Sequence, residues 1–134
     1  MSRENVDLVR EFLGLFAAGD RRSWRQHFAP DVVWDTSHSQ LPAAGVYRGH
    51  EGIEQFFADW LAIWDDYAVE NDEFIDAGDS VVVVFRQRGR GKGSGAHAER
   101  TFFGVYDLEA DKVTGFRMYE SREAALEAVG LSEQ

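Results

Sequence analysis

The sequence predicts an α+β domain in which helices pack on one face of a curved antiparallel sheet. Two helices are expected before any strand, because apolar residues recur at helical spacing over residues 2–18 and again around Trp24. A third helix, over residues 51–65, carries an aromatic stripe. Four strands with short turns between them follow, and short turns join antiparallel neighbours. We therefore expect one domain over residues 1–134.

Each element has its own local signal. Asp20 suits the N-cap of the short second helix, and Pro30 is expected to stop that helix. β-branched and aromatic residues predict strands, and clusters of Gly, Asp and Ser predict the turns between them. Ser121 suits the N-cap of a last helix that runs through Val129. The expected strands are 31–36, 46–48, 67–75, 81–88, 98–108 and 113–119.

The strand over residues 81–88 changes character halfway, from four valines to Arg86 and Arg88. Side chains alternate along a strand, so the two arginines share a face with Val82 and Val84. If that face is the one covered by the helices, the chain encloses a pocket that is apolar at its base and cationic at its mouth. Such a pocket suits a small, mostly apolar ligand with an oxygen or a carboxylate. The alternative is a strand end whose arginines point into water.

Composition excludes several classes of function. The net charge of −10 disfavours nucleic acids and anionic lipids as partners. No apolar run reaches the ~20 residues of a membrane-spanning helix, and no signal-peptide core is present, so the cytoplasm is the simplest location. The chain has no cysteine, which excludes disulfides and thiolate sites. The four histidines lack paired ligand spacing, so we expect no metal, and nothing in the sequence indicates a cofactor.

Several segments, in their order and spacing, carry a resemblance to a known family. They include Phe28-Ala29-Pro30-Asp31-Val32-Val33-Trp34, Tyr47-Arg48-Gly49, Ile75-Asp76-Ala77-Gly78-Asp79 and Glu123-Ala124-Ala125-Leu126-Glu127-Ala128-Val129-Gly130-Leu131. The chain resembles the nuclear transport factor two-like superfamily, and within it the SnoaL-like family related to polyketide cyclases and ketosteroid isomerases. The resemblance implies that the curved antiparallel sheet wraps around the helices as a cone, the cystatin-like α+β barrel. It implies this fold rather than one particular function, because the superfamily contains enzymes and non-catalytic binders.

The resemblance also implies which residues face the inside of the cone. The ligand-binding positions expected on this basis are aromatic for the most part, with Arg88 at the mouth. They are Phe12, Trp34, Thr36, Phe56, Trp60, Val84, Arg88, Phe102, Phe116 and Met118.

Ketosteroid isomerase activity is not expected. That branch uses a tyrosine, a protonated acid and a carboxylate base. At the matching positions this chain has Phe12, Phe102 and Thr36, and Asp35 lies one residue before the base position, on the opposite strand face. An arginine between two inward aspartates, as in the epoxide hydrolase relatives, is not found around Arg86, and no inward acid or histidine can be matched to the cyclases.

Three other residues are the candidates for catalysis: Glu120, Arg86 and His38. Glu120 could transfer protons, or it could pair with Arg122 or Arg88 at the rim. Arg86 could polarise a carbonyl, or it could form an ion pair with Glu99 or Glu73. His38 could lie over the pocket mouth, or it could be exposed in its loop.

Two hypotheses about function follow. The first is a small-molecule enzyme that applies acid–base chemistry, of cyclase, isomerase or hydrolase type, to a hydrophobic carbonyl compound. The second is a non-catalytic ligand-binding, dimerisation or accessory domain on the same fold. In either case the outer sheet face, expected to carry Val83, Phe85, Phe103, Val105 and Tyr119, predicts a homodimer because helices would leave it uncovered.

Overall fold

The computed structural model describes residues 2–18, 20, 23–39 and 44–131 and confirms the α+β class. The first half of the chain supplies α1 (Ser2–Ala17), the 3₁₀ helix η1 (Ser23–His27), β1 (Phe28–Asp35), β2 (Val46–Arg48) and α2 (Gly49–Leu61). The second half supplies β3 (Trp64–Asp76), β4 (Ser80–Gly91), β5 (His97–Glu109), β6 (Lys112–Tyr119) and α3 (Arg122–Ala128). No helix in these described ranges is long and apolar enough to cross a membrane.

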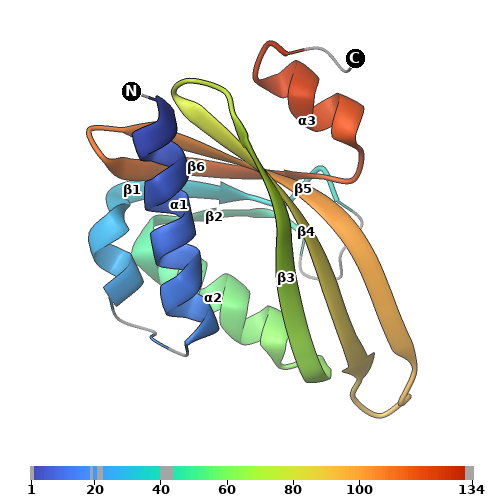
Figure 1. The fold of residues 1–134 in the computed structure, drawn as a ribbon. Coiled ribbons are helices and arrows are strands. Elements are labelled where there is room, and N and C mark those ends of the chain that lie inside the picture. The colour runs from blue at the N-terminus through green and yellow to red at the C-terminus, as the bar shows by residue number, and fades with distance from the viewer. Residues whose placement is uncertain (1, 19, 21–22, 40–43, 132–134) are drawn as a thin grey trace.

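The strands form one curved sheet in the order β2-β1-β6-β5-β4-β3. Neighbouring strands are antiparallel except β1 and β6, which run parallel. The sheet is therefore mixed, whereas the sequence predicted an antiparallel sheet. Figure 1 shows α1 and α2 together within the curve of the sheet and α3 apart from them. The main core lies between α1, α2 and the concave sheet face, where Val9, Phe12 and Ile53 are fully buried.

The boundary between η1 and β1 differs from the sequence prediction. Phe28 begins the strand, opposite Val113 of β6, and Pro30 lies inside the strand instead of merely ending a helix. The pairing with β6 shifts in register between Phe28 and Val33, and a proline that lacks an N–H is tolerated at such an irregularity. Asp20 behaves as expected, since its carboxylate accepts a hydrogen bond of 2.8 Å from the backbone N–H of Ser23.

The faces of β4 are the reverse of those expected. Val81, Val83 and Phe85 pack into the core beneath the helices, whereas Val82 packs on the opposite face with Val105 and Ala125. The register agrees, because Phe85 lies opposite Phe102, which also belongs to the main core. Five consecutive apolar residues are buried on both faces, and alternation alone cannot say which set faces the helices.

The convex face of the sheet is partly covered by the chain itself. Ala125 of α3 is fully buried against Val82 and Val105, and Phe103 and Tyr119 pack against the same cluster. Ser121 caps this helix, since its Oγ accepts a hydrogen bond of 3.1 Å from the N–H of Ala124. Val83 and Phe85 were wrongly expected on this face, where Val82 and Val84 lie instead, and α3 packs over part of it.

Candidate functional site

A cavity of about 470 Å³ lies between helices α1 and α2 and the concave face of the sheet. Its volume falls within the range of small-molecule sites, and its wall is mostly aromatic and aliphatic. The lining residues come from α1, α2 and every strand except β2. They are Leu13, Phe16, Trp34, Thr36, Phe56, Phe57, Trp60, Leu61, Tyr67, Ala68, Val69, Asn71, Phe85, Gln87, Tyr106, Phe116 and Met118.

Stacked rings build the end of the cavity nearest β1. The rings of Trp34 and Phe116 are stacked, with centroids 4.0 Å apart and an interplanar angle of 19°. Tyr106 tilts against Phe116 at 4.8 Å. Gly104 makes this arrangement possible, because a Cβ at that position would lie 2.6 Å from Cε1 of Phe116. The glycine is thus required by the close approach of an aromatic ring to the strand.

Two tyrosines bring hydroxyl groups to the same cavity. Burial raises the pKa of Tyr67 to about 12, although the hydrogen bond from the Trp60 indole opposes this shift. Burial also raises the pKa of Tyr106, and the nearby Tyr67 adds to the effect. Both phenols are therefore neutral at pH 7 and able to donate hydrogen bonds. Thr36 offers less, since its hydroxyl donates to the Gly45 carbonyl at 3.3 Å and accepts from the Gly45 N–H at 3.1 Å.

Two buried polar atoms of lining residues have no hydrogen-bond partner among the described parts of the protein. One is Nε1 of Trp34, a donor, and the other is Oε1 of Gln87, an acceptor. Trp34 is only 5% exposed. Buried polar groups usually find a partner, so each of these atoms is a position where a bound molecule or water gains a hydrogen bond.

The cavity is electrically neutral. None of the described residues that line it is Asp, Glu, His, Lys or Arg. Its hydrogen-bonding groups are hydroxyls, amides and indoles, which keep their charge state across the physiological pH range. The cationic mouth expected from the sequence is therefore wrong for this cavity.

Six of the expected ligand-binding residues line the cavity: Trp34, Thr36, Phe56, Trp60, Phe116 and Met118. The other four do not. Phe12 is fully buried in the core against Phe28 and Tyr106, and Val84 lies on the convex side of β4. Phe102 faces inward as expected and packs against Phe85, but together with Arg88 it borders a smaller neighbouring cavity of about 40 Å³.

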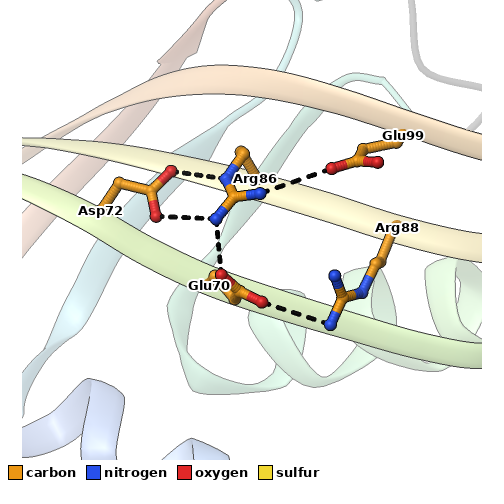
Figure 2. Close-up of polar contacts among 5 residues, drawn as sticks. All are labelled: Glu70, Asp72, Arg86, Arg88 and Glu99. Atoms are coloured by element: carbon orange, nitrogen blue, oxygen red, sulfur yellow. Dashed lines mark hydrogen bonds and ion pairs between the residues drawn. The ribbon is translucent and has the colours of Figure 1, made fainter.

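Arg86 is at the centre of a network of ion pairs on the convex face, outside the cavity (Figure 2). Its guanidinium donates to both carboxylate oxygens of Asp72, at 2.7 and 3.2 Å, and to Glu70 at 2.5 Å. Glu99 lies 3.5 Å away, and Glu70 also pairs with Arg88 at 3.2 Å. The hydrogen bonds that Arg86 donates to Asp72 raise the pKa of the guanidinium above its usual value. Of the two interpretations offered by the sequence for Arg86, the structure shows the cross-strand ion pair, with Asp72 and Glu70 as the principal partners.

Glu120 and His38 also lie outside the cavity wall. Glu120 pairs with Arg100, a partner that the sequence did not suggest. His38 stacks on Tyr119 with ring centroids 5.1 Å apart, and its Nε2 lies 3.8 Å from Asp35. Its side chain is half exposed, as the alternative interpretation expected. The structure therefore does not bring the three candidate catalytic residues together.

Sequence reasoning missed Tyr67, Tyr106 and Gln87 as lining residues. A signal for Tyr106 was available, because it shares a strand face with Phe102 and Gly104. Gln87 shares a face with Val83 and Phe85, so its position was hidden by the reversed assignment of β4. Tyr67 lies beside a register shift between Asp65 and Ala68, where alternation does not hold.

Comparison with protein families identifies the family of this chain. The model of the SnoaL-like domain matches residues 9–116, and the chain belongs to this family, within the NTF2-like superfamily. Among curated proteins, no sequence matches the chain significantly.

Solved structures show the same fold. An NTF2-like protein from Burkholderia thailandensis is 26% identical with a TM-score of 0.80, and the match covers 86% of this chain and 88% of that one. A second, from Burkholderia xenovorans, is 25% identical with a TM-score of 0.76, over 97% and 98% of the two chains. TerC, co-crystallised with polyporic acid, is 23% identical with a TM-score of 0.75, over 93% and 97%.

Proposed function

We propose that this protein binds a small, mostly aromatic molecule in the cavity enclosed by α1, α2 and the concave sheet face. The observation that carries the proposal is the combination of a cavity of about 470 Å³, an aromatic wall and a few neutral polar groups. This combination is typical of sites that hold a hydrophobic ligand and orient it with a small number of hydrogen bonds. The similarity in fold to TerC, which was co-crystallised with polyporic acid, supports the binding of a small organic molecule by this fold.

Binding is better supported than acid–base catalysis. A general acid or base must lie within hydrogen-bond reach of the reacting atom, either directly or through one water. The described cavity wall has no carboxylate and no imidazole, and Arg86 already holds two carboxylates on the convex face. We therefore put the non-catalytic ligand-binding hypothesis first.

Catalysis is the second candidate, and one observation favours it. The hydroxyls of Tyr67 and Tyr106 belong to one buried cavity and stay protonated at neutral pH, because burial raises both pKa values. Donors of this kind stabilise negative charge that develops on a carbonyl oxygen. Catalysis of this type would rely on the hydroxyls and on a base supplied by the substrate or by water.

Binding is tested by quenching of tryptophan fluorescence, since Trp34 and Trp60 both line the cavity. Titration with aromatic ketones should quench the emission and saturate. Replacing Asn71, a lining residue whose side chain shares a sheet face with Phe85, by Phe should reduce the affinity by filling the cavity. The matched control is Val84→Phe on the convex side of the same sheet, which should leave the affinity unchanged. Equal affinities of the two variants would contradict the assignment of the site.

We also propose that the protein forms a homodimer through the part of the convex face that α3 leaves uncovered. This part carries Arg86, Arg88, Glu70 and Glu99, whose opposite charges allow one copy to pair with another. The interface would therefore be polar and sensitive to salt. Sedimentation equilibrium at low and high salt tests it, with a dimer mass at low salt as the expected result. A monomer mass at every concentration and salt level would contradict it.

A further inference from the structure

The polar atoms of the cavity that lack partners are arranged at two separate places. Trp34 lies opposite Phe116, which lies opposite Tyr106, which in turn lies opposite Val81 of β4. Gln87 is six residues farther along β4. Strand residues rise by about 3.3 Å each, so the two side chains start from distant parts of the concave face. A molecule that reaches both is elongated rather than compact.

The two places have opposite hydrogen-bonding character. An indole N–H only donates, and a tyrosine hydroxyl beside it can donate too, so the end formed by Trp34 and Tyr106 suits a carbonyl or ether oxygen. The unpartnered atom of Gln87 is an acceptor, which suits a hydroxyl or an N–H. Trp60 does not change this pattern, since its indole already donates to Tyr67.

Charge gives a further condition on the ligand. An anion in this cavity would leave water without a cation to replace it, because no described lining residue is Lys, Arg or His. The arginines of β4 are turned to the convex face, where Asp72 and Glu70 neutralise Arg86 (Figure 2). The net charge of −10 makes the surroundings less favourable still for an anion.

Building on the proposed binding function, we infer that the ligand is an uncharged, elongated aromatic compound with a carbonyl at one end and a hydroxyl at the other. The carbonyl oxygen accepts from Trp34 and Tyr106, and the hydroxyl donates to Gln87. The rings between them lie against the aromatic wall. The site therefore selects a neutral hydroxy-ketone over the corresponding carboxylate, which is the opposite of what a cationic mouth would select.

Three matched probes test the inference. The first is a chalcone with a hydroxymethyl group on the ring remote from the carbonyl. The second is its methyl ether, which keeps the shape but cannot donate, and the third has a carboxylate in place of the hydroxymethyl group. A net hydrogen bond corresponds to about 2- to 12-fold in affinity, so the alcohol should bind more tightly than the ether by this factor. The carboxylate should bind at least about 10-fold more weakly than the alcohol.

Variants then assign each hydrogen bond to a residue. Gln87→Met keeps a side chain of similar length without the acceptor, and should make the alcohol and the ether bind equally. Trp34→Phe keeps an aromatic ring without the N–H, and should weaken all the ketones by a similar factor. Arg86→Gln, on the convex face, is the matched control and should leave all three affinities unchanged. The coupling at Gln87 remains measurable even if Trp34→Phe does not fold.

The outcomes separate this inference from the function on which it rests. If the three probes bind in the cavity with equal affinity, or the carboxylate binds best, the inference is wrong while the binding function stands. The inference would also be overturned if the ratio of alcohol affinity to ether affinity were the same in wild type and in Gln87→Met. That result would mean that the ligand hydroxyl does not donate to the Gln87 amide, whose oxygen would then be hydrogen-bonded to water. If none of the three quenches tryptophan emission at its solubility limit, the proposed binding of aromatic ketones fails as well.

Discussion

Replacing Gly104 by alanine tests the packing on which the cavity depends. The new Cβ would lie 2.6 Å from Cε1 and 3.1 Å from Cζ of Phe116, and 3.3 Å from Cε1 of Phe85. The Phe116 ring cannot move away freely, because Trp34 stacks on it and Tyr106 lies 4.8 Å away. Overpacking of this kind costs about 1–3 kcal/mol. Replacing a glycine by alanine also lowers the conformational entropy of the unfolded chain, which stabilises the folded protein by about 0.4–1 kcal/mol.

The midpoints of these two ranges differ by about 1.3 kcal/mol, which is the expected net destabilisation and lowers the melting temperature of a domain of this size by roughly 3–10 °C. Circular dichroism during thermal or urea unfolding measures it. Gly115→Ala, on the neighbouring strand, is the control, because its Cβ would meet nothing closer than 3.5 Å. The double variant Gly104→Ala with Phe116→Leu should recover part of the loss, since the clash involves that ring. Wild-type stability of Gly104→Ala would refute the described packing.

Three further predictions follow from the electrostatics and the helix cap. Tyr67 and Tyr106 should resist ionisation in an absorbance titration, because burial raises the pKa of both phenols. The stability that Tyr67 contributes is present below pH 10.0 and is lost as the pH rises through about 12, and that of Tyr106 changes in the same direction. Ionisation of all tyrosines near pH 10.0 would contradict their burial. Arg86→Gln should destabilise the protein at pH 7 and should have a smaller effect at low pH. Arg86 lowers the pKa of Asp72 below 3.8, so the stability that this pair contributes is lost as acid protonates the carboxylate. A difference in denaturant midpoint between variant and wild type that persists at about pH 2 would contradict this prediction. Ser121→Ala should cost about 0.5–2 kcal/mol by removing the cap of α3, with Ser121→Asp as the variant that retains it, and equal midpoints for the two would argue against the cap.

The fold could be predicted because its signals are local or ordered along the chain. Helical spacing located α1 and α2, and turn residues separated β3, β4, β5 and β6. Asp20 and Ser121 identified the starts of two helices through the capping chemistry of their side chains. The parallel pairing of β1 with β6 has no such local signal, because it depends on where the chain returns in space.

The site could be predicted only in part, and the reason lies in β4. Val81 to Phe85 are buried on both faces, so their sequence does not say which face meets the helices. Because the sequence prediction took the wrong face of β4 as the inner one, it assigned Arg86 and Arg88 to the pocket and left Gln87 outside it. The register of Phe85 with Phe102 resolves the choice, and cross-strand register is a property of the folded sheet. Residues on unambiguous elements, such as Trp34, Phe56 and Phe116, line the cavity.

The ion pairs on the convex face show a second limit. The sequence offered Glu99 and Glu73 as partners for Arg86, and Glu99 is one of them. Asp72, which Arg86 binds through both carboxylate oxygens, lies where the register of β3 against β4 shifts between Asn71 and Glu73. Such an irregularity changes which residue faces a given neighbour. The sequence therefore predicted that Arg86 pairs with an acidic residue of a neighbouring strand, but it did not identify Asp72 as that residue.

The central claim is that the neutral cavity beneath α1 and α2 is the ligand site and that the arginines of β4 take no part in it. A crystal structure of the protein with the hydroxymethyl chalcone bound tests this most directly. We predict the ligand between Trp34 and Gln87, with its carbonyl toward Trp34 and its hydroxyl toward the Gln87 amide. A ligand seated against Arg86 on the convex face, with Phe116 and Trp60 closing the cavity, would contradict the claim.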